Sequence, residues 1–130
     1  MKEMVFNDYV AAINEHDIDK ICSFIAEDHK FIDSDGNEVS GKAKMRLAWI
    51  GYFRWFPDYK IEITNIFNEN NTIGAFGFAS GSFKKKENKE PGNYFYIPAA
   101  WKAVIENDKL KLWQVYADTK RQIDIIERNK

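Results

Sequence analysis

The feature of this sequence that most constrains its fold is a change of apolar spacing at Pro57. Before Pro57, apolar residues recur every three or four positions, which is the spacing of amphipathic helices. After it, apolar and charged residues alternate, as in residues 60–63, which is the pattern of a strand with one buried face. We therefore predict helices in the first half of the chain and a long antiparallel meander in the second, which is an α+β fold.

The first half of the chain is expected to hold three helices and one short strand. Apolar spacing predicts helices over residues 3–15, 17–26 and 42–56. Asp17 can cap the second helix, because its side chain accepts a hydrogen bond from a free backbone N–H. The third helix ends at Pro57, because proline cannot continue a helix. Between them, residues 30–34 are predicted to form a strand that ends in an Asp35-Gly36 turn.

The second half is expected to form four strands and a short closing helix. Alternation predicts strands over residues 60–67, 72–83, 93–105 and 109–118. A helix over residues 119–128 closes the chain. The lysine-rich segment 84–93 is expected to be a solvated loop, because Glu87 and Glu90 dilute its positive charge.

Composition and charge fit one domain over residues 1–130 and exclude several function classes. The chain has 19 basic and 20 acidic residues, so it lacks the basic surface that a nucleic-acid partner normally needs. No apolar run is long enough for a membrane span, and the N-terminus does not resemble a signal peptide. A single cysteine, Cys22, rules out an internal disulfide and fits a reducing compartment. We therefore expect a cytoplasmic protein with no nucleic-acid or membrane partner.

Several segments together resemble the SnoaL-like group of the nuclear-transport-factor-2-like superfamily, which also contains ketosteroid isomerase. They occur in the family's order and are residues 9–19, 24–36, the helix start at Gly41, 56–63 and 115–123. The resemblance spans nearly the whole chain. It implies a cone-shaped barrel, in which a curved, mainly antiparallel sheet packs on three N-terminal helices and encloses a pocket.

Strand alternation assigns one face of each strand to the interior of that cone. The predicted inner set is apolar with a few polar points, as in most small-molecule sites. The residues expected to contact a ligand are Trp49, Phe53, Phe78, Trp101, Gln114 and Tyr116. The opposite face would carry Trp113, Val115 and Ala117 beside Gly77 and Ala79, and such an apolar face is poorly exposed in a monomer. We therefore predict a homodimer through the outer sheet face, as the resemblance also implies.

Asp33 is the first candidate catalytic residue. In a pocket rich in Phe and Trp, desolvation would raise the pKa of its carboxyl group and make it a general base. The resemblance aligns Asp33 with the base of ketosteroid isomerase and Tyr9 with that enzyme's oxyanion tyrosine. The alternative is that Asp33 caps the Asp35-Gly36 turn and that Tyr9 is an ordinary core residue.

Asp118 is the second candidate base, because SnoaL-like cyclases carry an acid in the matching segment. Its alternative role is to cap the closing helix. The sequence departs from the family in two ways, which weaken the predictions of isomerase and of cyclase activity respectively. Ala99 replaces the second oxyanion donor of the isomerase, a loss that typically costs ~2.7–4 kcal/mol, and residues 84–98 keep only Pro91-Gly92 of the cyclase pattern.

Two function classes therefore stay open. The first is a cofactor-free isomerase, cyclase or dehydratase that uses Asp33 or Asp118 as a base on an apolar carbonyl compound, with Tyr9 as hydrogen-bond donor. The second is a non-catalytic module that binds an apolar small molecule or only dimerises. No cofactor is expected, and no metal, because two histidines without a clear carboxylate geometry do not make a convincing site. His29 is expected at the surface, with a His29–Asp33 pair as the lesser alternative.

Overall fold

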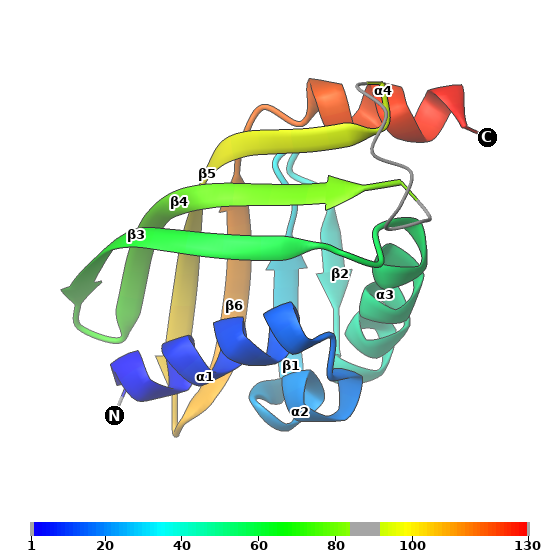
Figure 1. The fold of residues 1–130 in the computed structure, drawn as a ribbon. Helices are drawn as coiled ribbons and strands as arrows, with labels where there is room; N and C mark the ends of the chain where they lie inside the picture. Colours follow the sequence, from blue (N-terminus) through cyan, green and yellow to red (C-terminus); the bar gives the residue numbers. More distant parts are fainter. Residues whose placement is uncertain (1, 84–91, 130) are drawn as a thin grey trace.

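The structure, a computed structural model, describes residues 2–83 and 92–129. Four helices are found in these residues: α1 (Lys2–Glu15), α2 (Ile18–Ser23), α3 (Lys42–Trp55) and α4 (Lys120–Arg128). The strands are β1 (Ile25–Ile32), β2 (Glu38–Ser40), β3 (Lys60–Glu69), β4 (Thr72–Ser82), β5 (Tyr94–Glu106) and β6 (Lys109–Tyr116). Figure 1 shows the strands as one curved sheet, with α1 and α3 against its concave side.

The six strands form one open sheet in the order β2-β1-β6-β5-β4-β3. All neighbouring pairs are antiparallel except β1 and β6, which are parallel. The α+β class and the curved, mainly antiparallel sheet on N-terminal helices are therefore confirmed. The second helix is shorter than predicted, and the strand after it begins at Ile25 and not at residue 30.

Residues of α1 fix the position of the first meander strand. The Asn14 side chain accepts a hydrogen bond from the Ile61 N–H (2.8 Å) and donates one to the Ile61 carbonyl (3.0 Å). The backbone N–H of Ser82 donates to the Asp58 carboxylate at 2.7 Å. The Pro57-Asp58 turn thus holds the end of β4 beside the start of β3. The position where the apolar spacing changes in the sequence is therefore also where the helices end and the meander begins.

The sheet bends sharply along β3, β4 and β5 (Figure 1). Gly77 of β4 lies where the backbones of β3 and β4 come close. A methyl group at Gly77 would lie 1.8 Å from the carbonyl oxygen of Glu62, on the neighbouring strand. The pairing of β3 with β4 is irregular between Ile63 and Asn65. Bulges of this kind increase strand twist and bend the sheet, so a glycine here permits the curvature that makes the concave face.

The predicted facing of β6 was wrong, and a bulge explains the error. Val104 pairs with Leu112 while Ile105 pairs with Leu110, so Lys111 is an extra residue on β6. The alternation that starts with buried Leu110 is therefore shifted by one residue, and Trp113, rather than Leu112, becomes buried. Trp113, Val115 and Ala117 face the interior and line its cavity.

The predicted facing of β4 was also wrong. Phe78 was expected inside, but it stacks on Tyr96 of β5, and Phe76, two residues before it on the same face of the strand, is 54% exposed. Their small neighbours Ala75 and Ala79 are buried on the concave side instead. On β4, therefore, small residues point inward and the aromatic residues outward.

The predicted loop over residues 84–93 falls mostly outside the described residues, as do residues 1 and 130. None of the described helices is long and apolar enough to cross a membrane.

Candidate functional site

A cavity of about 260 Å³ lies between α3 and the concave face of the sheet. Its walls come from α3, from the inner faces of β5 and β6, and from the start of α4. Of the charged side chains in the described part of the chain, only the carboxylates Asp33 and Asp35 are on its lining. The site is therefore an apolar hollow with a weakly acidic rim, a lining suited to an uncharged ligand.

Three indole rings form much of the wall. Trp49 comes from α3, Trp101 from β5 and Trp113 from β6, and all three are buried. Trp101 and Trp113 stack with ring centroids 6.3 Å apart. Trp49 and Trp101 were both predicted to contact a ligand, and both lie on the cavity lining. Phe53, the third aromatic residue predicted from α3 and β5, is not on the lining and stacks on His16 with ring centroids 3.9 Å apart.

The polar wall of the cavity consists of Tyr52, Tyr59 and Gln122, which the sequence did not bring together. The Gln122 side-chain amide donates a hydrogen bond to the Tyr52 hydroxyl, which joins α4 to α3. Burial raises the pKa of both Tyr52 and Tyr59 well above that of a free phenol. The two hydroxyls therefore stay protonated and act as neutral hydrogen-bonding groups.

Asp33 lies on the cavity lining, but its carboxylate serves the turn that follows it. Its Oδ1 accepts hydrogen bonds from the backbone N–H groups of Asp35 and Asn37, each at 2.9 Å. Its Oδ2 accepts one from the Asn37 side-chain amide at 3.3 Å. This is the geometry of the capping alternative, and it leaves Oδ2 as the less occupied oxygen.

Asp118 lies outside the cavity. It lines a separate shallow hollow with Ile97, Pro98, Lys120, Arg121 and Asp124. Its Oδ1 accepts a hydrogen bond from the backbone N–H of Lys120 at 3.1 Å, at the start of α4. The N-cap residue of α4 is Thr119, so Asp118 stands one position before the cap, and its hydrogen bond belongs to the turn that leads into the helix.

Tyr9 is completely buried, and it is not among the residues that line the cavity. Its ring meets that of Trp113 edge to face at 4.9 Å, so the indole separates α1 from the cavity. Burial raises the pKa of its hydroxyl, and the nearby Trp49 indole offsets part of that rise. The structure therefore does not bring Tyr9 and Asp33 to one site.

The remaining predicted contacts, Phe78, Gln114 and Tyr116, are also absent from the cavity lining. Gln114 and Tyr116 alternate with the inward-facing Trp113 and Val115, so they lie on the outer face of β6. Tyr116 is 50% exposed there.

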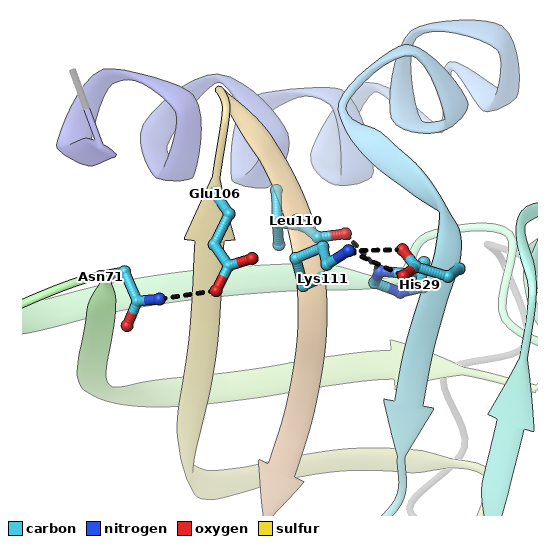
Figure 2. A network of polar contacts seen from close by, with 6 residues as sticks. His29, Asn71, Glu106, Leu110 and Lys111 are labelled. Atoms are coloured by element: carbon cyan, nitrogen blue, oxygen red, sulfur yellow. Dashed lines mark hydrogen bonds and ion pairs between the residues drawn. The ribbon is translucent and has the colours of Figure 1, made fainter.

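His29 is buried and not at the surface, which corrects the prediction. Its Nδ1 lies 2.9 Å from the Leu110 carbonyl oxygen, as a donor to that oxygen, and its Nε2 has no partner within the described residues (Figure 2). Burial lowers the pKa of the imidazole and keeps it neutral. The neighbouring Asp28 turns outward and pairs with Lys111 at 2.7 Å. The described part of the chain holds no cluster of three or more side chains suited to a metal ion.

Only part of this site was visible in the sequence. Tyr59 stands in the 56–63 segment that resembles the family, but nothing marks it as a wall residue. Gln122 and Tyr52 are 70 positions apart and meet only because α4 packs across the open end of the cone. No local pattern could have joined them.

Comparison with solved structures finds the same architecture in other proteins. A SnoaL-like polyketide cyclase, described as putative, from Shewanella denitrificans OS-217 has a TM-score of 0.81 at 15% identity, covering 98% of this chain and 97% of that one. An NTF2-like protein of unknown function from Burkholderia pseudomallei K96243 has a TM-score of 0.80 at 13% identity, covering 96% of each chain. TerC, co-crystallised with polyporic acid, has a TM-score of 0.77 at 13% identity, covering 97% and 98%.

These identities are low, so the structural likeness concerns the fold. No curated protein matches the sequence. The family comparison is more direct, because a model of the SnoaL-like domain matches residues 6–111, which is most of the chain. Together with the cone-shaped sheet and its cavity, this match shows that the chain belongs to the SnoaL-like domain family.

Proposed function

We propose that this protein binds a compact, uncharged, largely apolar small molecule in the cavity between α3 and the sheet. The observation that carries the proposal is a cavity of about 260 Å³ with an aromatic wall. An engineered apolar cavity of about 150 Å³ binds benzene, so this one suits a ligand of one or two rings. The similar TerC, which was crystallised with polyporic acid, supports a small-molecule ligand.

The test is binding of α-tetralone, a two-ring ketone, measured by isothermal titration calorimetry. Ala99 lies on the cavity wall, so Ala99→Phe places a ring in the hollow and should abolish binding. Ala11 is exposed on α1, and Ala11→Phe is the matched control that should keep it. Equal binding by both variants would place the ligand elsewhere and contradict the proposal.

A second candidate function is proton transfer on such a ketone, with Asp33 as the general base. The observation that favours it is the position of Asp33 on the cavity lining, with Oδ2 held only by a long hydrogen bond. Asp118 lies outside the cavity, so this alternative depends on Asp33. No cofactor is part of the proposal.

Deuterium exchange distinguishes the two functions. A base beside the carbonyl would exchange the C2 protons of α-tetralone with D₂O, which proton NMR follows directly. Catalysis predicts exchange that wild type accelerates and Asp33→Asn does not. Simple binding predicts a bound ketone with no accelerated exchange in either protein.

We also propose that the protein is a homodimer through the outer face of the sheet. The residues of that face are not those predicted, but they are also apolar: Phe67, Phe76, Phe78, Tyr96 and Tyr116. Glu62 and Lys102 lie on the same face, so a two-fold copy can set opposite charges against each other. The predicted cytoplasmic location stays a prediction.

A further inference from the structure

We propose that the rim of the cavity gives it a preference for ligands that carry a positive charge. The apolar body of such a ligand fills the hollow, and an ammonium group attached to that body lies at the rim beside Asp33 and Asp35. This inference rests on the proposed small-molecule site and goes beyond it, because it adds a second ligand class, the apolar amines, to the uncharged molecules. It assigns Asp35 a direct contact with the ligand.

The charge on the cavity lining has a single sign. Asp33 and Asp35 are the charged side chains on the lining, and no lysine, arginine or histidine joins them among the described residues. Lys30 of β1 and Lys120 of α4 are each paired with another carboxylate, at 3.5 Å and 3.3 Å, and Arg121 lies on the separate shallow hollow. The field at the rim is therefore negative, so it attracts cations and repels anions.

The two carboxylates differ in how far the fold uses them. Asp33 accepts three hydrogen bonds, and all three come from neutral N–H groups, which hold the carboxylate without cancelling its charge. Asp35 contributes its backbone N–H to the turn, but its exposed carboxylate forms no hydrogen bond or ion pair with any described residue. The Asp35 carboxylate can therefore meet a charged group of a ligand without breaking a contact of the fold.

Aromatic rings stand next to this acidic rim. Phe31 comes two residues before Asp33 and pairs in register with Trp113 of β6, and both rings are on the cavity lining. Trp49 and Trp101 continue the aromatic wall. The face of an aromatic ring attracts an ammonium group, and tryptophan does so most strongly. The carboxylates and the aromatic wall thus favour the same kind of charge.

The charge of the ligand stays at the rim, where water still reaches it. An ammonium group inside the apolar hollow would lose its hydration, which carries a large penalty. Asp35 is exposed and Asp33 is half-buried, so a group beside them keeps part of its water. Ion pairs that are this exposed are individually weak. We therefore expect a preference among ligands of one shape, and not an absolute requirement for a charge.

The test compares three probes that share one two-ring body and differ in charge. At neutral pH, 2-aminotetralin carries an ammonium group, 2-tetralol an uncharged hydroxyl and tetralin-2-carboxylate a negative charge. Their dissociation constants are measured by isothermal titration calorimetry at low salt. Wild type should bind the amine about three- to tenfold more tightly than the alcohol, the combined effect of an exposed ion pair and a cation–π contact. The carboxylate should bind more weakly than the alcohol.

Substitutions at the rim remove the charge and keep the shape. Asp35→Asn should reduce the preference for the amine and leave binding of 2-tetralol unchanged, and adding Asp33→Asn should reduce it further. The asparagine at position 33 can still accept the two backbone hydrogen bonds of the turn. Asp8 is exposed on α1 and is not on the lining, so Asp8→Asn is the matched control that should keep the preference. High salt should also weaken the preference in wild type.

Chemical shifts show where the ammonium group lies. In a ¹⁵N–¹H spectrum, 2-aminotetralin should shift the backbone N–H signals of residues 35–37 in addition to the indole signals of the cavity. With 2-tetralol, the turn signals should shift less. This readout depends on the position of the charged group and not on the stability of the variants.

Each outcome is decisive. An amine preference that is the same in wild type, in Asp35→Asn and in the double variant overturns the role of the rim, and binding of 2-tetralol then leaves the proposed function standing. Equal binding of the amine and the carboxylate overturns the inference in the same way, as do amine-induced shifts that spare residues 35–37. Failure of wild type to bind any of the three probes overturns the proposed function, and this inference with it.

Discussion

Gly77→Ala should destabilise the protein strongly, because the added methyl group has no space. It would lie 1.8 Å from the Glu62 carbonyl oxygen, 2.9 Å from the Glu62 carbonyl carbon and 3.1 Å from the Ile63 Cα. All three atoms belong to the backbone of β3, so no flexible side chain can move away. The two strands must separate locally.

The magnitude follows from what that separation breaks. Loss of one or two ladder hydrogen bonds costs about 0.5–1.5 kcal/mol each, and overpacking adds about 1–3 kcal/mol. Replacing glycine by alanine in a strand returns roughly 0.5–1 kcal/mol. The free energy of unfolding should therefore fall by about 2–4 kcal/mol, which for a domain of this size lowers Tm by about 10 °C.

Urea denaturation measures this change, and Gly74→Ala on the same strand is the matched control. A methyl group at Gly74 meets nothing within 4 Å, so that variant should be as stable as wild type or slightly more stable. If Gly77→Ala and Gly74→Ala had the same stability, β3 and β4 would not approach as closely as described, and the account of the sheet's curvature would be wrong.

Two further predictions concern pH and assembly. Burial lowers the folded-state pKa of His29, so protonation favours the unfolded chain. The stability that the neutral His29 contributes is present above about pH 6.5. It is lost as the pH falls towards the lower folded-state pKa. Unfolding between pH 7.5 and 5.5 should therefore show less acid destabilisation in His29→Gln than in wild type, whereas His16→Gln should keep it. Phe76→Lys should convert a dimer to a monomer in sedimentation velocity, whereas Leu47→Lys, at an exposed apolar residue of α3, should not. A dimer in both variants would reject the outer face as the interface.

The sequence predicted the architecture well because the relevant signals are local. The change of apolar period at Pro57 separated helices from meander, and the start of α3 after Gly41 was placed correctly. Gly41 has φ +95°, a conformation that favours glycine. Such signals depend on the residues beside them and not on distant packing.

The facing of β4 and β6 could not be predicted in the same way. The extra residue at Lys111 is visible only through the pairing of β6 with β5, and one inserted residue reverses every later side chain. The candidate base Asp33 was placed on the correct wall, but the sequence could not decide between base and turn cap. The polar wall of Tyr52, Tyr59 and Gln122 depends on how α4 packs, which is a long-range property.

The most direct test of the central claim, that the cavity holds a small apolar molecule, uses the four tryptophans as reporters. Trp49, Trp101 and Trp113 line the cavity, while Trp55 is 42% exposed at the end of α3. In a ¹⁵N–¹H spectrum titrated with α-tetralone, the three cavity indole N–H signals should shift together and saturate, with the Trp55 signal unchanged. A titration in which the three cavity signals stay fixed, or only that of Trp55 moves, would contradict the account.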